Sequence, residues 1–149
     1  MKKYLFLIKL FLIYLLLNAN GISKELDFFT LGLKHFKNKE LDKSKIFFEK
    51  DLVFNPKSEK SYLYLAKIFD LRKNEEEQEI NLNNVLLLNP KNDEAIYMLT
   101  LIKIKQSNYD EAKKLVEKFI LVCKSFCSKE SEMQNKLKEF SSKNEKSNN

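Results

Sequence analysis

Cys123 and Cys127 are the two residues whose type and spacing could form a covalent bond. In an exported protein, two cysteines favour a disulfide. Four residues apart on a helix, their α-carbons would lie about 6 Å from each other, which a disulfide can span. The alternatives are a bridge across a turn after the helix, or two small, partly buried side chains without a bond. We favour the disulfide, and the absence of a nearby histidine or further cysteine argues against a metal site.

His35 and the acidic run Glu75-Glu76-Glu77-Gln78-Glu79 are the other candidates for chemistry. A lone histidine without a neighbouring ligand set is best explained as a packed or half-exposed helical residue. The acidic run falls in a turn and the first turn of a helix, where carboxylates compensate the helix dipole. The sequence contains no Gly-rich phosphate loop, nucleophile elbow or metal-binding histidine pair. It therefore predicts a protein that is not an enzyme and takes no cofactor.

An internal repeat sets the elements that position these side chains. The only prolines, Pro56 and Pro90, are 34 apart, and each lies in an Asn-Pro-Lys triplet. Proline ends a helix, and a period of this size is typical of one helix-turn-helix repeat. Shifting the sequence by 34 superposes apolar residues in three copies: Leu31, Leu65 and Leu99; Phe28, Tyr62 and Ile96; Phe48, Leu82 and Val116; Leu52, Leu86 and Ile120.

The period predicts three helical hairpins, in repeats 25–58, 59–92 and 93–126. Their helices are expected at 25–38 and 42–54, at 59–72 and 76–88, and at 93–106 and 110–122. We expect side-chain caps at the helix starts from Asp42, Ser58, Asn92 and Asp110. Segment 127–140 should form a capping helix, mainly over 129–140, because Met133, Leu137 and Phe140 make a single apolar stripe. Residues 141–149 are predicted to be a disordered polar tail.

The stretch Leu31-Gly32-Leu33-Lys34-His35-Phe36, with Leu41-Asp42-Lys43-Ser44, Phe47-Phe48-Glu49-Lys50 and Asn55-Pro56 after it, resembles a tetratricopeptide repeat (TPR). Tyr109-Asp110-Glu111-Ala112 and Glu117-Lys118 are similar to its second half. Gly32, Ala66 and Ser44 would remove side-chain bulk where the helices of a hairpin cross, beside large residues such as Phe48. The resemblance covers residues 25–126. It implies an all-α, right-handed superhelical solenoid of three hairpins plus the capping helix.

The resemblance also implies a binding surface, because in this family the first helix of each hairpin lines a concave groove that holds the ligand. The groove residues would be Phe29, Leu33, Phe36, Lys37, Lys60, Leu63, Lys67, Tyr97, Leu101, Ile104 and Lys105, with Leu26, Asp70 and Glu94 at matching positions. The polar clamp that some family members use for peptide C-termini is absent, since Phe29, Leu33 and Leu63 stand there. An apolar groove favours an amphipathic helix or an apolar segment as ligand. The alternative is that these side chains pack within the chain or against a second copy.

Residues 1–21 differ from the repeats. Lys2 and Lys3 precede an apolar stretch at 4–17, which only Lys9 interrupts, and small or polar residues follow at 18–21. This pattern predicts a signal peptide cleaved after Gly21, with an uncleaved membrane anchor as the alternative. Either predicts export, to the periplasm or to a membrane-anchored position facing it. The membrane would be contacted only through an uncleaved N-terminus.

The charge of the chain argues against nucleic acid as a partner. Residues 1–21 hold three of the 27 lysines and arginines and no acid, so the rest carries a formal charge of +3 rather than +6. Charges of both signs alternate along the helices, as on a solvated surface. We therefore predict a protein-binding TPR module of the bacterial cell envelope. Groove lysines Lys37, Lys60, Lys67 and Lys105 would attract acidic flanks of the ligand. The alternative is a structural envelope protein that self-associates as a homo-oligomer.

Overall fold

The computed structural model describes residues 27–147, so the signal peptide or anchor predicted at 1–21 lies outside the described residues. Every regular element in the described part is a helix. The elements are α2 (Phe28–Lys37), α3 (Leu41–Phe54), α4 (Glu59–Leu71), α5 (Glu75–Leu88), α6 (Asp93–Lys105), α7 (Tyr109–Val122), the 3-10 turn η1 (Cys127–Lys129) and α8 (Glu130–Ser147). Within residues 27–147, no helix combines the length and the apolar character needed to cross a bilayer.

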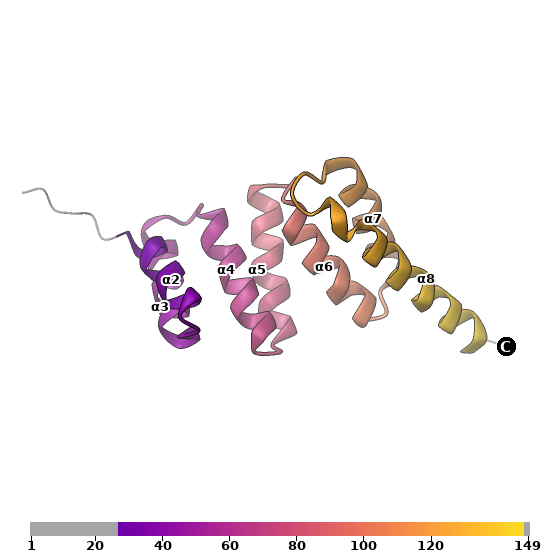
Figure 1. The fold of residues 1–149 in the computed structure, drawn as a ribbon, viewed down its shortest axis with the longest axis horizontal. Helices are drawn as coiled ribbons and strands as arrows, with labels where there is room; N and C mark the ends of the chain where they lie inside the picture. Colours follow the sequence, from indigo (N-terminus) through magenta and orange to yellow (C-terminus); the bar gives the residue numbers. More distant parts are fainter. Residues whose placement is uncertain (1–26, 148–149) are drawn as a thin grey trace, which may run out of the picture.

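The helices form three antiparallel hairpins in a row, α2/α3, α4/α5 and α6/α7, and α8 packs against α7 and α6 (Figure 1). Short turns join the helices within each hairpin at one edge of the molecule. The connections 55–58, 89–92 and 123–126 lie at the opposite edge, which is uppermost in Figure 1. The predicted solenoid of three helical hairpins and a C-terminal capping helix is confirmed.

The three turns within the hairpins share one backbone conformation. Each contains a non-glycine residue in the left-handed region, namely Lys39 (φ 61°), Lys73 (φ 59°) and Ser107 (φ 61°). In the first turn the Glu40 N–H donates to the His35 carbonyl and the Lys39 N–H donates to the Phe36 carbonyl, both at 3.0 Å. The other two turns repeat these bonds at the matching positions of the second and third hairpins. This is the Schellman motif, which satisfies the last carbonyls of a helix.

Asparagine side chains cap three of the helix starts by accepting a hydrogen bond from a backbone N–H three residues further on. They are Asn74 for α5, Asn92 for α6 and Asn108 for α7. Asn92 was predicted, but the predictions for Asp42 and Asp110 were wrong, because α3 and α7 begin one residue earlier and enclose them. Ser58 precedes α4, yet its hydroxyl lies 3.1 Å from the Ser61 hydroxyl instead of accepting from an amide.

Small side chains allow the helices of each hairpin to cross closely. Gly32 and Ser44 are buried, and the Ser44 hydroxyl donates to the Gly32 carbonyl at 2.9 Å. A β-carbon added at Gly32 would lie 2.7 Å from Cε1 of Phe48, which is fully buried. The expected close crossing at Gly32 is therefore confirmed.

The apolar core falls into two clusters. Phe48, Leu65, Ile68 and Phe69 join the first hairpin to α4. The larger cluster joins the second and third hairpins to α8. Its buried residues are Ala66, Leu82, Val85, Ala95, Ile96, Leu99, Ile102, Leu115, Val116, Phe119 and Met133.

The structure differs from the prediction at the end of the chain. Helix α8 does not stop at residue 140 but continues to Ser147, through part of the predicted disordered tail. Residues 141–147 contain no proline or glycine to end the helix, and lysine and glutamate support its continuation. Met133 is fully buried and Leu137 packs on the larger core cluster, as a capping helix requires.

Candidate partner-binding groove

Two adjoining clefts lie along α4 and α6. The first has a volume of about 360 Å³ and is lined by Phe36, Lys67, Asp70, Leu71, Glu94, Tyr97, Met98 and Phe126. The second has a volume of about 250 Å³ and is lined by Asp70, Lys73, Glu75, Gln78, Tyr97, Met98, Leu101, Ile102 and Lys105. Because both include Asp70, Tyr97 and Met98, they form one continuous depression, which we call the concave groove.

Tyr97 stands in the middle of the concave groove and is fixed by residues of η1 and α8. Its hydroxyl donates to a Glu132 carboxylate oxygen at 3.0 Å, and the Lys129 ammonium lies 5.4 Å from the centre of its ring. Burial raises the pKa of Tyr97, and the hydrogen bond to Glu132 raises it further. The phenol therefore remains a neutral donor, and its ring is held as a rigid wall of the groove.

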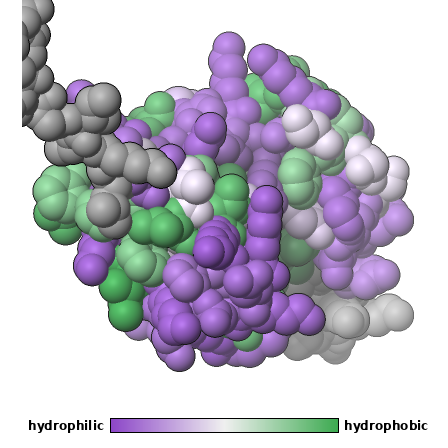
Figure 2. Space-filling view, turned by 60° about the vertical axis from the view of Figure 1, so that its left-hand side comes forward, coloured by the Kyte–Doolittle hydropathy of each residue, from purple (hydrophilic) through white to green (hydrophobic). Residues whose placement is uncertain are grey.

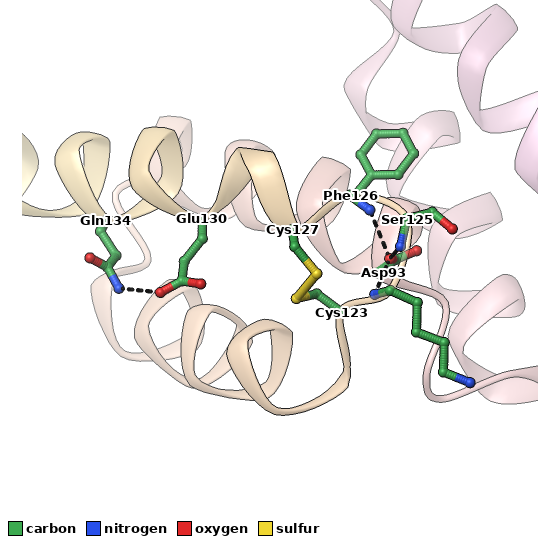
Figure 3. The surroundings of a disulfide bond; sticks show 8 residues. Asp93, Cys123, Ser125, Phe126, Cys127, Glu130 and Gln134 are labelled. Carbon is green, nitrogen blue, oxygen red and sulfur yellow. Dashed lines mark hydrogen bonds between the residues drawn. A yellow bond between two sulfur atoms is a disulfide. The ribbon is translucent and has the colours of Figure 1, made fainter.

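A stapled loop supplies the aromatic residue at one end of the concave groove (Figure 3). Cys123 and Cys127 form a disulfide with their α-carbons 5.3 Å apart, across the turn between α7 and η1. Between them, the backbone N–H groups of residues 124, 125 and 126 all donate to Oδ2 of Asp93, at 2.7, 2.6 and 2.9 Å. Phe126 is thereby held with its ring centroid 6.1 Å from that of Tyr97.

The Asp93 carboxylate is adapted to this role. Burial raises the pKa of Asp93, but the hydrogen bonds from the loop amides outweigh this effect, and the pKa lies below its ordinary value. Backbone amides that donate to a carboxylate stabilise its charged form. Asp93 therefore stays ionised and holds the loop at neutral pH.

Two of the three lysines that line the concave groove, Lys67 and Lys105, are paired with carboxylates of the same chain, whereas Lys73 forms no ion pair within residues 27–147. The Lys67 ammonium lies 2.8 Å from Glu94 and 4.8 Å from the centre of the Tyr64 ring. Lys105 pairs with Glu75. These two lysines therefore do not give the groove the unpaired positive charge expected from the sequence.

Comparison with known proteins establishes the fold. No protein-family model matches the sequence, and no curated protein matches it. Solved structures do match.

The first TPR domain of Spaghetti (RPAP3), bound to the HSP90 peptide SRMEEVD, is 20% identical to this chain with a TM-score of 0.65. The match covers 77% of this chain and 88% of that one. The Sgt2 TPR domain from Aspergillus fumigatus is 18% identical with a TM-score of 0.62, over 85% of this chain and 82% of that one. The chain has the TPR fold.

A TPR protein from Parabacteroides merdae also matches, with 21% identity and a TM-score of 0.71 over 85% of this chain. The present chain covers 48% of that protein, so it spans about half of its length. At these identities the likeness concerns the fold, which places the first helix of each TPR hairpin on the concave side.

The structure brings together five of the groove residues predicted from the TPR resemblance: Phe36, Lys67, Tyr97, Leu101 and Lys105. Six others do not line either cleft: Phe29, Leu33, Lys37, Lys60, Leu63 and Ile104. Phe29 packs inside the first hairpin, with ring centroids 5.7 Å from Phe48 and 5.9 Å from Tyr64. Leu63 packs against the larger core cluster.

The sequence reasoning missed Leu71, Met98 and Phe126 of the first cleft, and Lys73, Glu75, Gln78 and Ile102 of the second. Leu71 and Met98 lie on first helices, each one position after a residue that was assigned to the groove. Phe126 is the last residue of the third repeat, where the matching residues Ser58 and Asn92 are polar, so the repeat period did not indicate an aromatic groove residue there. Its aromatic side chain between two cysteines was the only available signal.

The other candidates for chemistry have structural roles in this TPR fold. The His35 ring stacks on Phe47 at 5.1 Å and bonds to Glu40, whose pKa this bond holds below its ordinary value. Glu79, from the acidic run, pairs with the buried Lys103. Within residues 27–147, no group of three histidine, cysteine or acidic side chains could hold a metal ion.

Proposed function

We propose that this protein is a non-enzymatic interaction module that binds a protein or peptide segment in its concave groove. The observation that carries the proposal is a preformed depression lined by the apolar side chains of Phe36, Leu71, Tyr97, Met98 and Phe126. Concave sites with apolar walls and a few polar groups are the usual form of binding sites. The solved Spaghetti TPR domain, of the same fold, was bound to a peptide.

The ligand is inferred to be an apolar or amphipathic segment rather than an acidic peptide tail. Lys67 and Lys105 already have carboxylate partners at the edges of the groove. To reach Lys67 or Lys105 an acidic ligand would have to displace these partners, which leaves Lys73 as the one lysine of the groove without an ion pair among the described residues. Apolar side chains can enter without breaking the ion pairs. Because the disulfide, Asp93 and Glu132 hold the walls in place, binding loses little conformational entropy.

The site of action is proposed to be the cell envelope of a bacterium. The apolar segment at 4–17 has the composition of an export signal or anchor. The disulfide between Cys123 and Cys127 is consistent with an oxidising compartment such as the periplasm.

Photo-crosslinking in cells tests the groove. A photoreactive amino acid is placed at Met98, which lines both clefts, and in a separate variant at Asn83, an exposed residue of α5 outside them. We expect the Met98 variant to capture one defined protein that the Asn83 variant does not capture. Leu71→Lys, at a residue 57% exposed, should abolish the capture without unfolding the protein.

Two results would contradict the proposal. Capture of the same neighbours from both positions would show that the groove is not selective. Capture of only a second copy of the chain from Met98 would support the structural, self-associating alternative.

A further inference from the structure

The edge of the solenoid that contains connections 55–58, 89–92 and 123–126, which we call the loop edge, exposes a row of apolar side chains. Val53, Leu87 and Leu121 are the penultimate residues of α3, α5 and α7, and they are 76%, 79% and 85% exposed. They occupy the same position in successive repeats, so every hairpin contributes one. An apolar residue exposed at the same place in three successive repeats indicates a contact surface rather than chance.

The first hairpin extends this row. Phe54 is 74% exposed and stacks on Phe28 with ring centroids 5.4 Å apart. Figure 2, which brings the α2/α3 end forward, shows apolar side chains gathered there among hydrophilic ones. The first hairpin therefore adds a second strongly exposed apolar side chain, Phe54, to the loop edge.

An exposed lysine follows each apolar residue of the row. Lys57 and Lys91 come four residues after Val53 and Leu87, and Lys124 comes three residues after Leu121. None of these three ammonium groups takes part in an ion pair within the described residues. A lysine beside an apolar surface can lay its aliphatic stem along that surface and extend its charge beyond it.

Three carboxylates of the loop edge are bonded inward. Asp51 accepts from the Ser61 hydroxyl at 2.5 Å. Glu59 accepts from the side-chain amides of Asn89 and Asn92, at 2.9 and 2.5 Å. Asp93 is occupied by the amides of the next connection. The exposed charges that directly follow the residues of the apolar row are therefore the three lysines, while Asp27, the cap of α2, is an exposed carboxylate at the same edge.

The chain also enters the fold at the loop edge. Helix α2 is antiparallel to α3, so its first residue, Phe28, lies at the same edge as the end of α3 (Figure 1). The apolar segment 4–17 precedes it, and residues 18–26 join the two. Nine residues span at most about 30 Å, so in the uncleaved form of the chain the loop edge stays close to the membrane that the apolar segment enters.

We propose that the loop edge rests on an anionic lipid surface. The apolar row would enter the interface between headgroups and acyl chains, while the lysines contact the lipid phosphates. Lipid offers both an apolar interior and a negatively charged surface, and it fits the direction from which the chain arrives. The proposal is independent of the ligand in the concave groove.

Tryptophan fluorescence of the full chain with vesicles tests this contact, because the natural sequence contains no tryptophan. Leu87→Trp introduces one at the loop edge. The matched control is Ile80→Trp, on the same helix at a residue 48% exposed. Ile80 precedes Leu87 by seven residues, or about two helical turns, so it lies on the same face of α5, about 10 Å further from the loop edge. The vesicles contain brominated acyl chains and are either phosphatidylcholine alone or a mixture with phosphatidylglycerol.

We expect the Leu87→Trp emission to shift to the blue and to be quenched in the anionic vesicles, severalfold more than that of Ile80→Trp. Each lysine near such a surface contributes about fivefold to the contact equilibrium. Combining Leu87→Trp with Lys57→Gln, Lys91→Gln and Lys124→Gln should therefore weaken the contact about a hundredfold and remove the quenching.

Three outcomes would overturn the proposal. Absence of quenching in both lipids would show that the loop edge does not face the bilayer. Equal quenching at Leu87→Trp and Ile80→Trp would place another surface against the lipid. If Leu87→Trp is quenched in vesicles of pure phosphatidylcholine as strongly as in the anionic vesicles, or if its quenching survives the lysine replacements, anionic headgroups are not what the loop edge recognises. Circular dichroism of each variant verifies that it is folded.

Discussion

At the scale of single residues, each hairpin pairs a small side chain on its first helix with a large one on its second. At the matched positions the pairs are Gly32 with Phe48, Ala66 with Leu82, and Thr100 with Val116, and all six residues are buried. As the first residue becomes larger, the second becomes smaller. Close packing requires this compensation, because a core leaves little room for an added methyl group.

Gly32→Ala should therefore destabilise the protein by about 1–3 kcal/mol, although alanine favours a helix more than glycine does. The added methyl group would clash with the Phe48 ring. Phe48→Leu alone should also destabilise by about 1 kcal/mol or more. The double variant recreates the Ala66/Leu82 pair of the second hairpin, so its loss should be smaller than the sum of the two single losses. Urea unfolding of the four proteins measures the coupling.

Simple addition of the two losses would contradict the packing argument. Asn83→Ala, at an exposed residue of α5, is the control and should change the free energy of unfolding by less than about 0.5 kcal/mol.

Single residues also mark how far the sequence could predict the site. Gly32 and Phe48 could be placed because the repeat provides two further copies for comparison. Phe29 could not, because the rings of Phe48 and Tyr64 surround it, and helical spacing alone does not show which of two adjacent apolar faces is covered. Phe126 has no counterpart in a regular element.

At the scale of elements, the first helix of each hairpin ends in a strained turn. Lys39, Lys73 and Ser107 adopt the left-handed conformation that glycine tolerates best. A β-carbon there costs about 1–2 kcal/mol, partly offset because a lysine or serine restricts the unfolded chain more than glycine does.

Lys73→Gly should therefore stabilise the protein by up to about 1 kcal/mol, although it removes a side chain. Lys91→Gly is the matched control, since Lys91 is exposed but is not among the residues with positive φ. It should be neutral or destabilising. Thermal unfolding of both variants provides the measurement, and a lower melting temperature for Lys73→Gly would show that the lysine side chain, which lines the groove, stabilises the fold by more than its backbone conformation costs.

The elements were the most predictable part of the structure. Asn-Pro breaks and a fixed period located all six hairpin helices, with α3, α5 and α7 beginning one residue before the expected position. That difference arises because Asn74 and Asn108 provide the caps of α5 and α7 from within the turns. The exposure of Leu87 was not predictable, since it lies in an unbroken apolar run with Leu86 and Leu88.

At the scale of the whole molecule, the second and third hairpins each hold the connection that leaves them. Glu59, the first residue of α4, binds the side chains of Asn89 and Asn92 after α5. Asp93, the first residue of α6 and the match of Glu59 in the next repeat, binds the backbone amides after α7. The second and third hairpins and the capping helix are therefore linked by polar contacts as well as by their apolar core.

Asp93→Asn weakens the contact between α6 and the connection after α7, and it should lower the free energy of unfolding by about 1–2 kcal/mol at neutral pH. The pKa of Asp93 is lower in the folded protein than its ordinary value. The stabilisation is therefore present above the pKa of the unfolded chain and is lost as the pH falls through the folded pKa. The difference in the free energy of unfolding between wild type and Asp93→Asn should therefore decrease as the pH is lowered. Urea unfolding at a series of pH values from about 7 to 2 measures it.

Asp110→Asn is the control, because that carboxylate is exposed at the start of α7 and accepts none of the hydrogen bonds from the loop amides. If the difference in the free energy of unfolding between wild type and Asp93→Asn is the same at low pH as at neutral pH, the charge of the carboxylate does not hold the loop.

The residue whose carbonyl closes each hairpin turn differs among the three repeats. It is His35 in the first, stacked on Phe47 and bonded to Glu40, and Phe69 in the second, within the apolar core. In the third it is Lys103, paired with Glu79 and Glu111. Each side chain suits only its own surroundings, so a hairpin displaced by one repeat would leave a charge in the core or an aromatic ring among carboxylates. The residue at this position therefore distinguishes the three hairpins from one another. This disfavours misfolded forms in which a hairpin packs in the place of its neighbour, and it disfavours the exchange of hairpins between two chains.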